Sequence, residues 1–225
     1  MAEYIKPDEI EKRSFEIIKS ELPYPIDPAL APVIMRVIHT TADFEYLQSL
    51  AFSEGVIEHA VAVLRRGAVI VSDTNMVKSG VDKLRLHALG GEVCCFMNDE
   101  DVAEAARLGG VTRARASVDK ASTMEKPLVF AIGNAPTALI RICELIEAGA
   151  ISPELVIGVP VGFVNVVESK EMLMRSGIPY IAARGRSHHN GCRYQHGTKL
   201  SDVTTIATPG GSQTGGVRMR RIREV

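Results

Sequence analysis

The sequence has almost no net charge and little cysteine, and it contains no long uninterrupted apolar run. Lys and Arg number 26 against 27 Asp and Glu, which gives a formal charge of −1. Bulk electrostatics therefore favour neither a nucleic-acid partner nor a membrane surface. No apolar stretch approaches the ~18 residues that a membrane-spanning helix needs. We expect a protein without nucleic-acid or membrane partners, in which any recognition by charge is local.

The four cysteines do not suggest a disulfide framework. Cys94 and Cys95 are neighbours in an apolar run, and Cys143 and Cys192 stand apart from them. We expect reduced thiols inside a core, as in a cytoplasmic protein. The amino terminus soon becomes polar and lacks the basic start and apolar centre of a signal peptide, which also predicts a cytoplasmic location.

Motifs for nucleotides and metals are missing or weak. No Gly-x-Gly-x-x-Gly follows the first expected strand and no Gly-Lys-Ser/Thr phosphate loop occurs, which disfavours a dinucleotide site. His188, His189, Cys192 and His196 are spaced closely enough to suggest zinc. That segment, however, has no second pair of ligands and no apolar periodicity. We expect no metal site and no cofactor.

What the sequence does contain is an alternation of short apolar runs with amphipathic segments. Five runs of strand length cover residues 68–72, 92–97, 128–132, 155–159 and 178–182. Helical patterns cover residues 7–20, 28–39, 53–66, 99–108, 112–121, 136–148 and 166–176. This order predicts one doubly wound α/β domain over residues 1–186, with a mainly parallel five-stranded sheet and helices on both faces.

Polar and small residues follow four of the five apolar runs. In an open parallel sheet, ligands bind beyond the carboxyl ends of the strands, so the loops at that edge are the expected site. The residues of interest are Asp73, Thr74 and Asn75 after the first run, Asn134 and Thr137 after the third, Gly162 and Phe163 after the fourth, and Arg184-Gly185-Arg186 after the fifth.

His39 is the candidate proton donor. It ends an expected helix, and two threonines and Asp43 follow it closely in the sequence. An imidazole titrates near neutral pH, as a general acid must. The simpler alternative is a helix-end histidine without a catalytic role. His59 and His87 lack such neighbours, and we expect them at the surface or on a helix flank.

Arg113 is the candidate binder of an anionic ligand. It lies at the start of an expected helix, where a cation opposes the helix macrodipole. A ligand that carries carboxylates would explain this placement. Arg115, two residues further on, we expect to be an ordinary solvated charge.

These segments together resemble the precorrin-8X methylmutase family, called cobalt-precorrin-8 methylmutase in the anaerobic route to cobalamin. The resemblance covers roughly residues 1–186 and involves several segments in order. They are Lys12-Arg13-Ser14-Phe15, the run from Arg36 to Asp43, the run from Ser72 to Val77, the run from Gly133 to Leu139, and the run from Val156 to Asn165. The resemblance implies an α/β homodimer that moves a methyl group from carbon 11 to carbon 12 of a corrinoid macrocycle, by an acid-assisted 1,5-sigmatropic shift and without a cofactor.

The resemblance also implies roles for individual residues. His39 matches the family's proton donor, and a protonated ring nitrogen would spread charge over the carbons that exchange the methyl. The acetate and propionate groups of the substrate would be bound by polar side chains. The expected substrate-binding residues are Ser14, Arg36, Thr40, Asp73, Thr74, Asn75, Arg113, Asn134, Thr137, Gly162 and Phe163.

Two other functions compete with the isomerase. A non-catalytic carrier could keep the corrinoid site without turning substrate over. A dinucleotide-dependent reductase would rest on the predicted sheet alone, which is analogy at the level of the fold.

Residues 187–225 depart from the resemblance. From Arg184 onward, eight Lys and Arg stand against two Asp and Glu, a local charge of +6. A one-base shift of the reading frame over His188 to Thr198 permits Thr-Thr-Met-Ala-Ala-Ala-Ile-Asn-Thr-Ala-Leu, the kind of alanine-rich helix that the family has at this point. Our hypothesis is an out-of-frame, poorly packed tail.

Overall fold

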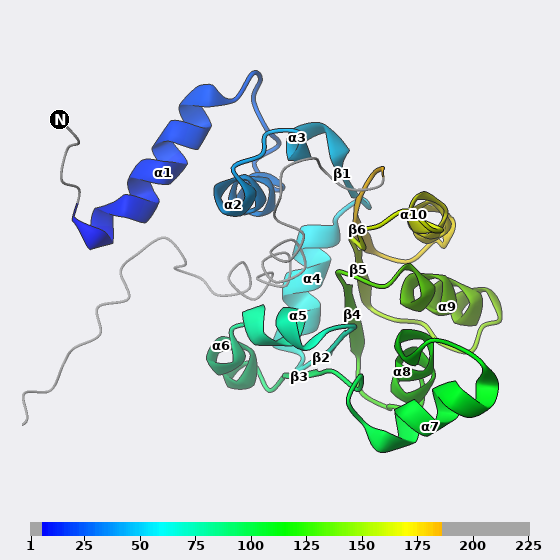
Figure 1. Cartoon of the computed structure of the whole chain (residues 1–225). Helices are drawn as coiled ribbons and strands as arrows, with labels where there is room; N and C mark the ends of the chain where they lie inside the picture. Colours follow the sequence, from blue (N-terminus) through cyan, green and yellow to red (C-terminus); the bar gives the residue numbers. More distant parts are fainter. Residues whose placement is uncertain (1–5, 186–225) are drawn as a thin grey trace, which may run out of the picture.

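A six-stranded sheet runs through the computed structural model, which describes residues 6–185 (Figure 1). Its strands, in sheet order, are β1 (Leu50–Phe52), β6 (Tyr180–Ala183), β5 (Leu155–Gly158), β4 (Leu128–Ile132), β2 (Val69–Ser72) and β3 (Glu92–Cys94). Strands β2 to β6 pair in parallel and β1 pairs antiparallel with β6. The mainly parallel sheet is confirmed, with six strands where five were predicted.

Ten helices surround the sheet within the described residues. They are α1 (Pro7–Glu21), α2 (Ala31–Thr41), α3 (Tyr46–Ser49), α4 (Val56–Arg65), α5 (Asn75–Gly80), α6 (Lys83–Ala88), α7 (Glu100–Gly109), α8 (Arg113–Ala121), α9 (Pro136–Glu147) and α10 (Val166–Arg175). Seven of them were predicted, and the short α3, α5 and α6 were not. The predicted start of α2 at Pro28 is wrong. Asp27 instead closes a turn, accepting hydrogen bonds from Ala29 N and Leu30 N, and the helix begins after that turn.

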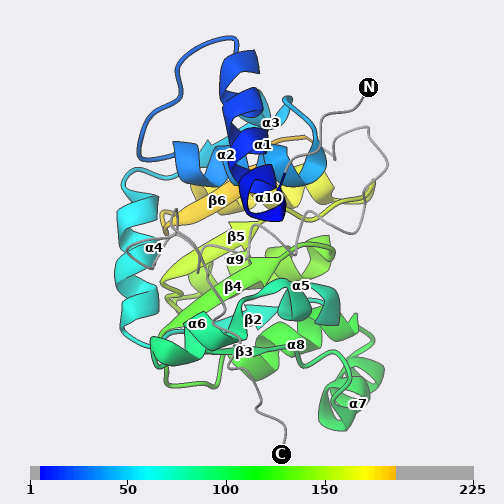
Figure 2. The same cartoon turned by 90° about the vertical axis from the view of Figure 1, so that its left-hand side faces the viewer.

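Helices cover both faces of the sheet, as predicted (Figures 1 and 2). α8, α9 and α10 lie on one side, where Phe130 and Val156 belong to a core shared with Leu139. α2 and α4 lie on the other side, over Ile157 and Ile181. Successive residues of a strand point to opposite faces, so strands that are apolar throughout require a helix layer on each side.

The chain reverses its course between β2 and β4. From β2 it passes to β3 on one side, and then returns to β4, β5 and β6 on the other. In doubly wound sheets, this reversal opens a crevice at the carboxyl ends of the two strands concerned. The loops after β2 and β4 are therefore neighbours, although about sixty residues separate them.

Several predictions concern residues outside the described range. The tail of residues 187–225 and the histidine and cysteine cluster of residues 188–196 both lie there. Within residues 6–185, no group of three His, Cys, Asp or Glu side chains could hold a metal ion. In the same range, Cys94, Cys95 and Cys143 are free thiols. No helix in the described part of the chain has the length and apolar character to cross a bilayer.

Candidate functional site

His39 lies in the last turn of α2 and stacks on Phe15 of α1. The ring centroids are 5.1 Å apart and the ring planes differ by 26°. The guanidinium carbon of Arg36 lies 4.8 Å from the centroid of the same Phe15 ring, and Arg36 Nη1 also donates to Glu11 Oε1. One aromatic ring thus holds two predicted site residues, and a carboxylate balances the charge of one of them.

The two hydroxyls that follow His39 serve the backbone instead of the imidazole. Thr40 Oγ1 donates to Arg36 O at 2.9 Å, and Thr41 Oγ1 donates to Val37 O at 2.8 Å. Threonines near a helix end often bond the carbonyl one turn back in this way. The threonines that made His39 a candidate in the sequence therefore do not distinguish it in the structure. The stack on Phe15 does so. Thr40 keeps lone pairs with which it could accept a hydrogen bond from a ligand.

Ser14 lies on α1, one residue before Phe15. Its hydroxyl donates to Ile10 O at 2.8 Å, which leaves its oxygen able to accept. α1, α2 and α5 lie on the same side of the sheet (Figures 1 and 2). The predicted residues of the amino-terminal helices therefore share a side with the loop after β2.

Asp73, the first residue after β2, is 3% exposed. Its Oδ1 accepts from Gly133 N at 3.0 Å, and its Oδ2 accepts from Asn134 N at 2.8 Å and Ala135 N at 2.6 Å. Burial raises the pKa of this carboxyl, although the three N–H groups act in the opposite direction. We predicted that Asp73 contacts substrate. Because both of its oxygens accept hydrogen bonds from the loop after β4, this contact stays a prediction that the geometry does not favour.

Thr74 and Asn75 begin α5 at the same edge. Thr74 caps the helix, and its Oγ1 accepts from Val77 N at 3.1 Å. A hydroxyl that accepts at a cap can still donate its own proton to a ligand. Asn75 is the first helical residue and is exposed. Ser72 Oγ approaches Thr74 O and Cys94 O, each at 3.1 Å, and so ties the ends of β2 and β3 together.

Asn134 and Thr137 stand on either side of the start of α9. Asn134 is exposed, and Thr137 lies in the first turn of the helix. The hydroxyls of Thr137 and Thr112 lie 2.9 Å apart. Thr112 is the cap of α8, directly before Arg113. Hydrogen bonds therefore link Asp73, the loop after β4 and the start of α8 into one connected edge.

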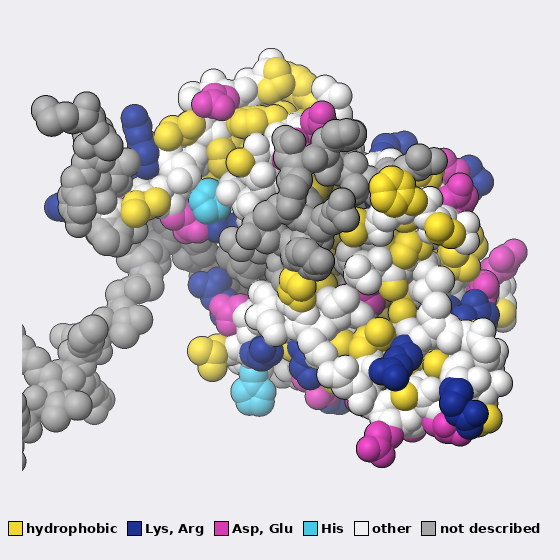
Figure 3. All heavy atoms as spheres, viewed as in Figure 1, with side chains coloured by type: hydrophobic (Ala, Val, Ile, Leu, Met, Phe, Trp, Pro, Cys, Tyr) yellow, Lys and Arg dark blue, Asp and Glu magenta, His cyan; other side chains and the backbone are white. Residues whose placement is uncertain are grey.

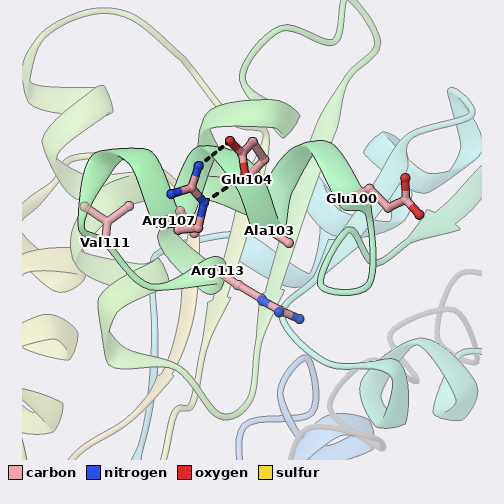
Figure 4. Close-up of a pocket in the computed structure, with 7 residues that line it drawn as sticks. Glu100, Ala103, Glu104, Arg107, Val111 and Arg113 are labelled. Carbon is pink, nitrogen blue, oxygen red and sulfur yellow. Dashed lines mark hydrogen bonds and ion pairs between the residues drawn. The ribbon is translucent and has the colours of Figure 1, made fainter.

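Arg113 is exposed and lines an open groove of about 570 Å³ (Figure 4). The other lining residues are Glu100, Ala103, Glu104, Ala106, Arg107 and Val111. Arg107 pairs with Glu104 at 2.7 Å, whereas Arg113 points away from that pair (Figure 4). Charges of both signs are interspersed on this part of the surface (Figure 3). The groove contains no other predicted site residue, so it is at most one margin of a larger site.

Arg115 is not the solvated charge that we predicted. Its Nη1 and Nη2 donate to the two carboxylate oxygens of Glu144, at 3.0 and 2.7 Å. Arg141 contacts the same carboxylate at 3.0 Å and Asp119 at 2.6 Å. Hydrogen bonding to Arg115 is the main reason that the pKa of Glu144 lies below its ordinary value. Arg115 is thus a structural tie between α8 and α9, in contrast to its neighbour two residues earlier.

The loop after β5 carries an exposed apolar tip. Phe163 is 80% exposed and Val164 is 77% exposed. Gly162 has φ of +136°, a conformation that other residues rarely adopt, and it turns the chain outward before the tip. Two adjacent apolar side chains in water are a candidate surface for a ligand or for another protein chain.

Lys170 is a residue at this edge that the sequence analysis missed. It lies in α10, is 2% exposed, and donates from Nζ to Gly185 O at 2.9 Å. Burial lowers its pKa to about 8. Helical side chains lean toward the amino end of their helix, which brings this ammonium group to the carboxyl edge of the sheet. In the sequence, its position between Val166 and Leu173 on the apolar face of α10 indicates a buried lysine.

Comparison with known proteins identifies relatives over most of the chain. Residues 9–187 match the family model described as precorrin-8X methylmutase. The cobalt-precorrin-8 methylmutase of Priestia megaterium is 43% identical over 183 residues, which cover 81% of each chain. The precorrin-8X methylmutase of Pseudomonas aeruginosa is 39% identical over 190 residues, covering 83% of this chain and 91% of that one. The crystal structure of precorrin-8X methylmutase from Thermus thermophilus superposes with a TM-score of 0.75 at 35% identity, covering 88% and 98% of the two chains.

Proposed function

We propose that this chain, which belongs to the precorrin-8X methylmutase family, moves a methyl group from carbon 11 to carbon 12 of a corrinoid macrocycle. The chain is an isomerase of the methylmutase class with a role in cobalamin biosynthesis. The observation that carries the finer proposal is the stack of His39 on Phe15, beside Arg36. It supports an imidazole held in one orientation beside a guanidinium that is paired with Glu11 and has further N–H groups to offer a substrate carboxylate.

In the proposed reaction, His39 donates a proton to a nitrogen of the macrocycle. Positive charge then spreads over the carbons that exchange the methyl, which lowers the barrier to a 1,5-sigmatropic shift. The bond from carbon 11 to the methyl breaks as the bond to carbon 12 forms, and the proton returns from nitrogen to His39. Substrate and product are isomers, so no second substrate takes part. The stack on Phe15 holds the imidazole in one orientation during these steps.

The other site residues hold the periphery of the substrate in this proposal. Acetate and propionate groups would be bound through charge-assisted hydrogen bonds by Arg36 and Arg113. The hydroxyls of Ser14, Thr40, Thr74 and Thr137 and the amides of Asn75 and Asn134 would complete the set, with Gly162 and Phe163 at the margin. No cofactor and no metal are part of the proposal.

Conversion of substrate tests the proposed function against the carrier alternative. The full chain is incubated with precorrin-8 and, separately, with cobalt-precorrin-8, because relatives of both descriptions match. We expect a change of the visible spectrum, with the methyl found on carbon 12 by NMR. A coloured complex that forms without any conversion would favour the carrier. The substrate that is converted faster shows whether the chain acts in the route to cobalamin with cobalt already inserted or in the route without it.

Arg113→Ala is expected to weaken corrinoid binding without loss of stability. Loss of one charge-assisted hydrogen bond, about 1.5–3 kcal/mol, corresponds to a roughly 10- to 100-fold increase in Kd. Arg107→Ala is the matched control, because Arg107 lines the same groove but is paired with Glu104. Spectroscopic titration gives the affinities and thermal unfolding gives the stabilities. A drop of several degrees in Tm at unchanged affinity would show that Arg113 has a structural role instead.

We propose a homodimer whose interface borders the site. The exposed tip formed by Phe163 and Val164 supports this, because Gly162 and Phe163 of the same loop are also expected to border the substrate. Sedimentation velocity at micromolar concentration should give about twice the 24.4 kDa of the chain. A species of one chain mass at that concentration counts against the dimer.

We also propose that residues 1–186 form the catalytic domain and that the protein is cytoplasmic. The family match, which ends at residue 187, supports the domain limit. The out-of-frame hypothesis for residues 187–225 stays a prediction, and the nucleotide sequence of the gene decides it.

A further inference from the structure

We propose that Asp73 is a positioning residue for the methyl transfer, and that its buried carboxylate sets the spacing of the substrate-binding groups after β2, after β4 and at the start of α8. The inference rests on the proposed function. In this proposal Asp73 does not touch the substrate. It acts on catalysis by holding Asn134, Thr137 and Arg113 in place.

The geometry of Asp73 differs from that of an ordinary helix cap. Three consecutive N–H groups, of Gly133, Asn134 and Ala135, converge on its two oxygens at 2.6 to 3.0 Å. Ala135 is the cap residue of α9 and offers no side-chain acceptor of its own. Asp73 supplies that acceptor from a different strand. A carboxylate near a helix amino terminus also interacts favourably with the macrodipole.

The bonds of Asp73 join substrate-binding groups that stand on different loops. Thr74 follows Asp73 directly, and Asn134 is one of the three residues whose backbone it fixes. In the first turn of α9, Thr137 contacts Thr112, which stands immediately before Arg113. The connection crosses the reversal point between β2 and β4. Groups that bind separate carboxylates of one rigid macrocycle must keep fixed distances, so this connection is useful for binding and catalysis.

Asn is the informative replacement because it has nearly the same shape as Asp. An amide has one acceptor oxygen, and its NH₂ group would face an N–H of the loop, donor against donor. The loop must then shift to relieve this contact. A misplacement of about 1 Å away from the chemistry can cost about 10²-fold in rate. We therefore expect the displaced loop to lower kcat/KM by a larger factor than it lowers the folded fraction.

The test compares Asp73→Asn and Asp73→Glu with the control Asp82→Asn. Asp82 is also an aspartate that accepts from a backbone N–H, of Arg85 at 3.0 Å, but it caps α6 and has no bond to the loop after β4. We measure kcat and KM with the natural substrate, Kd for a corrinoid product, and the folded fraction by circular dichroism. For Asp73→Asn we expect kcat/KM to fall about 10²-fold per folded molecule. The control should stay within about twofold of wild type.

Asp73→Glu keeps the test decisive if Asp73→Asn does not fold. The glutamate retains the charge and both acceptors, but its longer arm displaces the loop, so an intermediate loss of kcat/KM is expected. Wild-type kcat/KM in a folded Asp73 variant, or a loss that only matches the unfolded fraction, overturns the inference. Failure of the proposed function looks different, because then the wild type itself does not convert substrate. In that case corrinoid affinity decides: weaker binding by the Asp73 variants supports the positioning role, and equal binding overturns it.

Discussion

Replacing His39 with Ala or Asn should reduce turnover strongly while the protein stays folded. General acid catalysis contributes about 10²- to 10⁴-fold, and we expect a loss of kcat in that range. The ring stacks on Phe15, with centroids 5.1 Å apart, at a half-buried position, so its removal costs packing but does not open the buried core. Rates measured with saturating substrate and normalised to folded protein check this.

The matched control for His39 is His87→Ala. His87 is an exposed histidine of α6, and its removal should leave turnover unchanged. Corrinoid product should still bind the His39 variants, because the expected carboxylate binders remain. A loss smaller than tenfold would contradict the role of His39 as proton donor. Loss of product binding along with turnover would show that the imidazole binds the ligand and does not only transfer a proton.

The sequence predicted the buried elements well because parallel strands have an unambiguous pattern. β2, β4 and β5 are buried along their whole length, and each appears as an apolar run. β1 was missed because it has three residues and pairs only with β6. α5 and α6, with six residues each, were hidden in what looked like a long loop. Their caps, Thr74 and Asp82, are residue types that favour helix starts, and they indicate both helices in the sequence.

The orientation of side chains at the site could not be predicted to the same extent. The rule for parallel sheets placed Asp73 correctly at the carboxyl edge, but its direction depends on β4 being the neighbour of β2. That adjacency joins residues about sixty positions apart, and no local pattern encodes it. The same holds for Arg113 and Arg115, which have similar sequence settings. Only the packing of α8 against α9 gives Arg115 the partner Glu144.

Lys170→Met is expected to stabilise the protein at neutral pH. The lysine is 2% exposed, and its Nζ bonds a neutral carbonyl, Gly185 O. Within residues 6–185, no carboxylate forms an ion pair with this ammonium group. A buried ammonium without a counter-charge is costly. Methionine has a similar length and gives up the charge, at the loss of one hydrogen bond.

The pH dependence of that gain is the sharper measurement. Burial lowers the pKa of Lys170 from 10.5 to about 8, so between these values the unfolded chain holds a proton that the folded protein has released. Wild-type stability therefore rises with pH across this window, and below pH 8 the full cost of burial is present. A pKa shift of this size corresponds to about 3 kcal/mol of folding free energy. In the variant, the lost hydrogen bond to Gly185 offsets part of this gain.

Urea unfolding of wild type and Lys170→Met at pH 7 and pH 10 tests this expectation. The stability difference should favour the variant at pH 7 and shrink at pH 10, and titrations common to both proteins cancel in the difference. Lys126→Met is the control, because Lys126 is exposed and paired with Glu92 at 2.7 Å, and it should show no such gain. If Lys170→Met is instead less stable at both pH values by the same amount, then the bond to Gly185 outweighs the cost of burying the charge. In that case the lysine stabilises the chain segment that leaves β6.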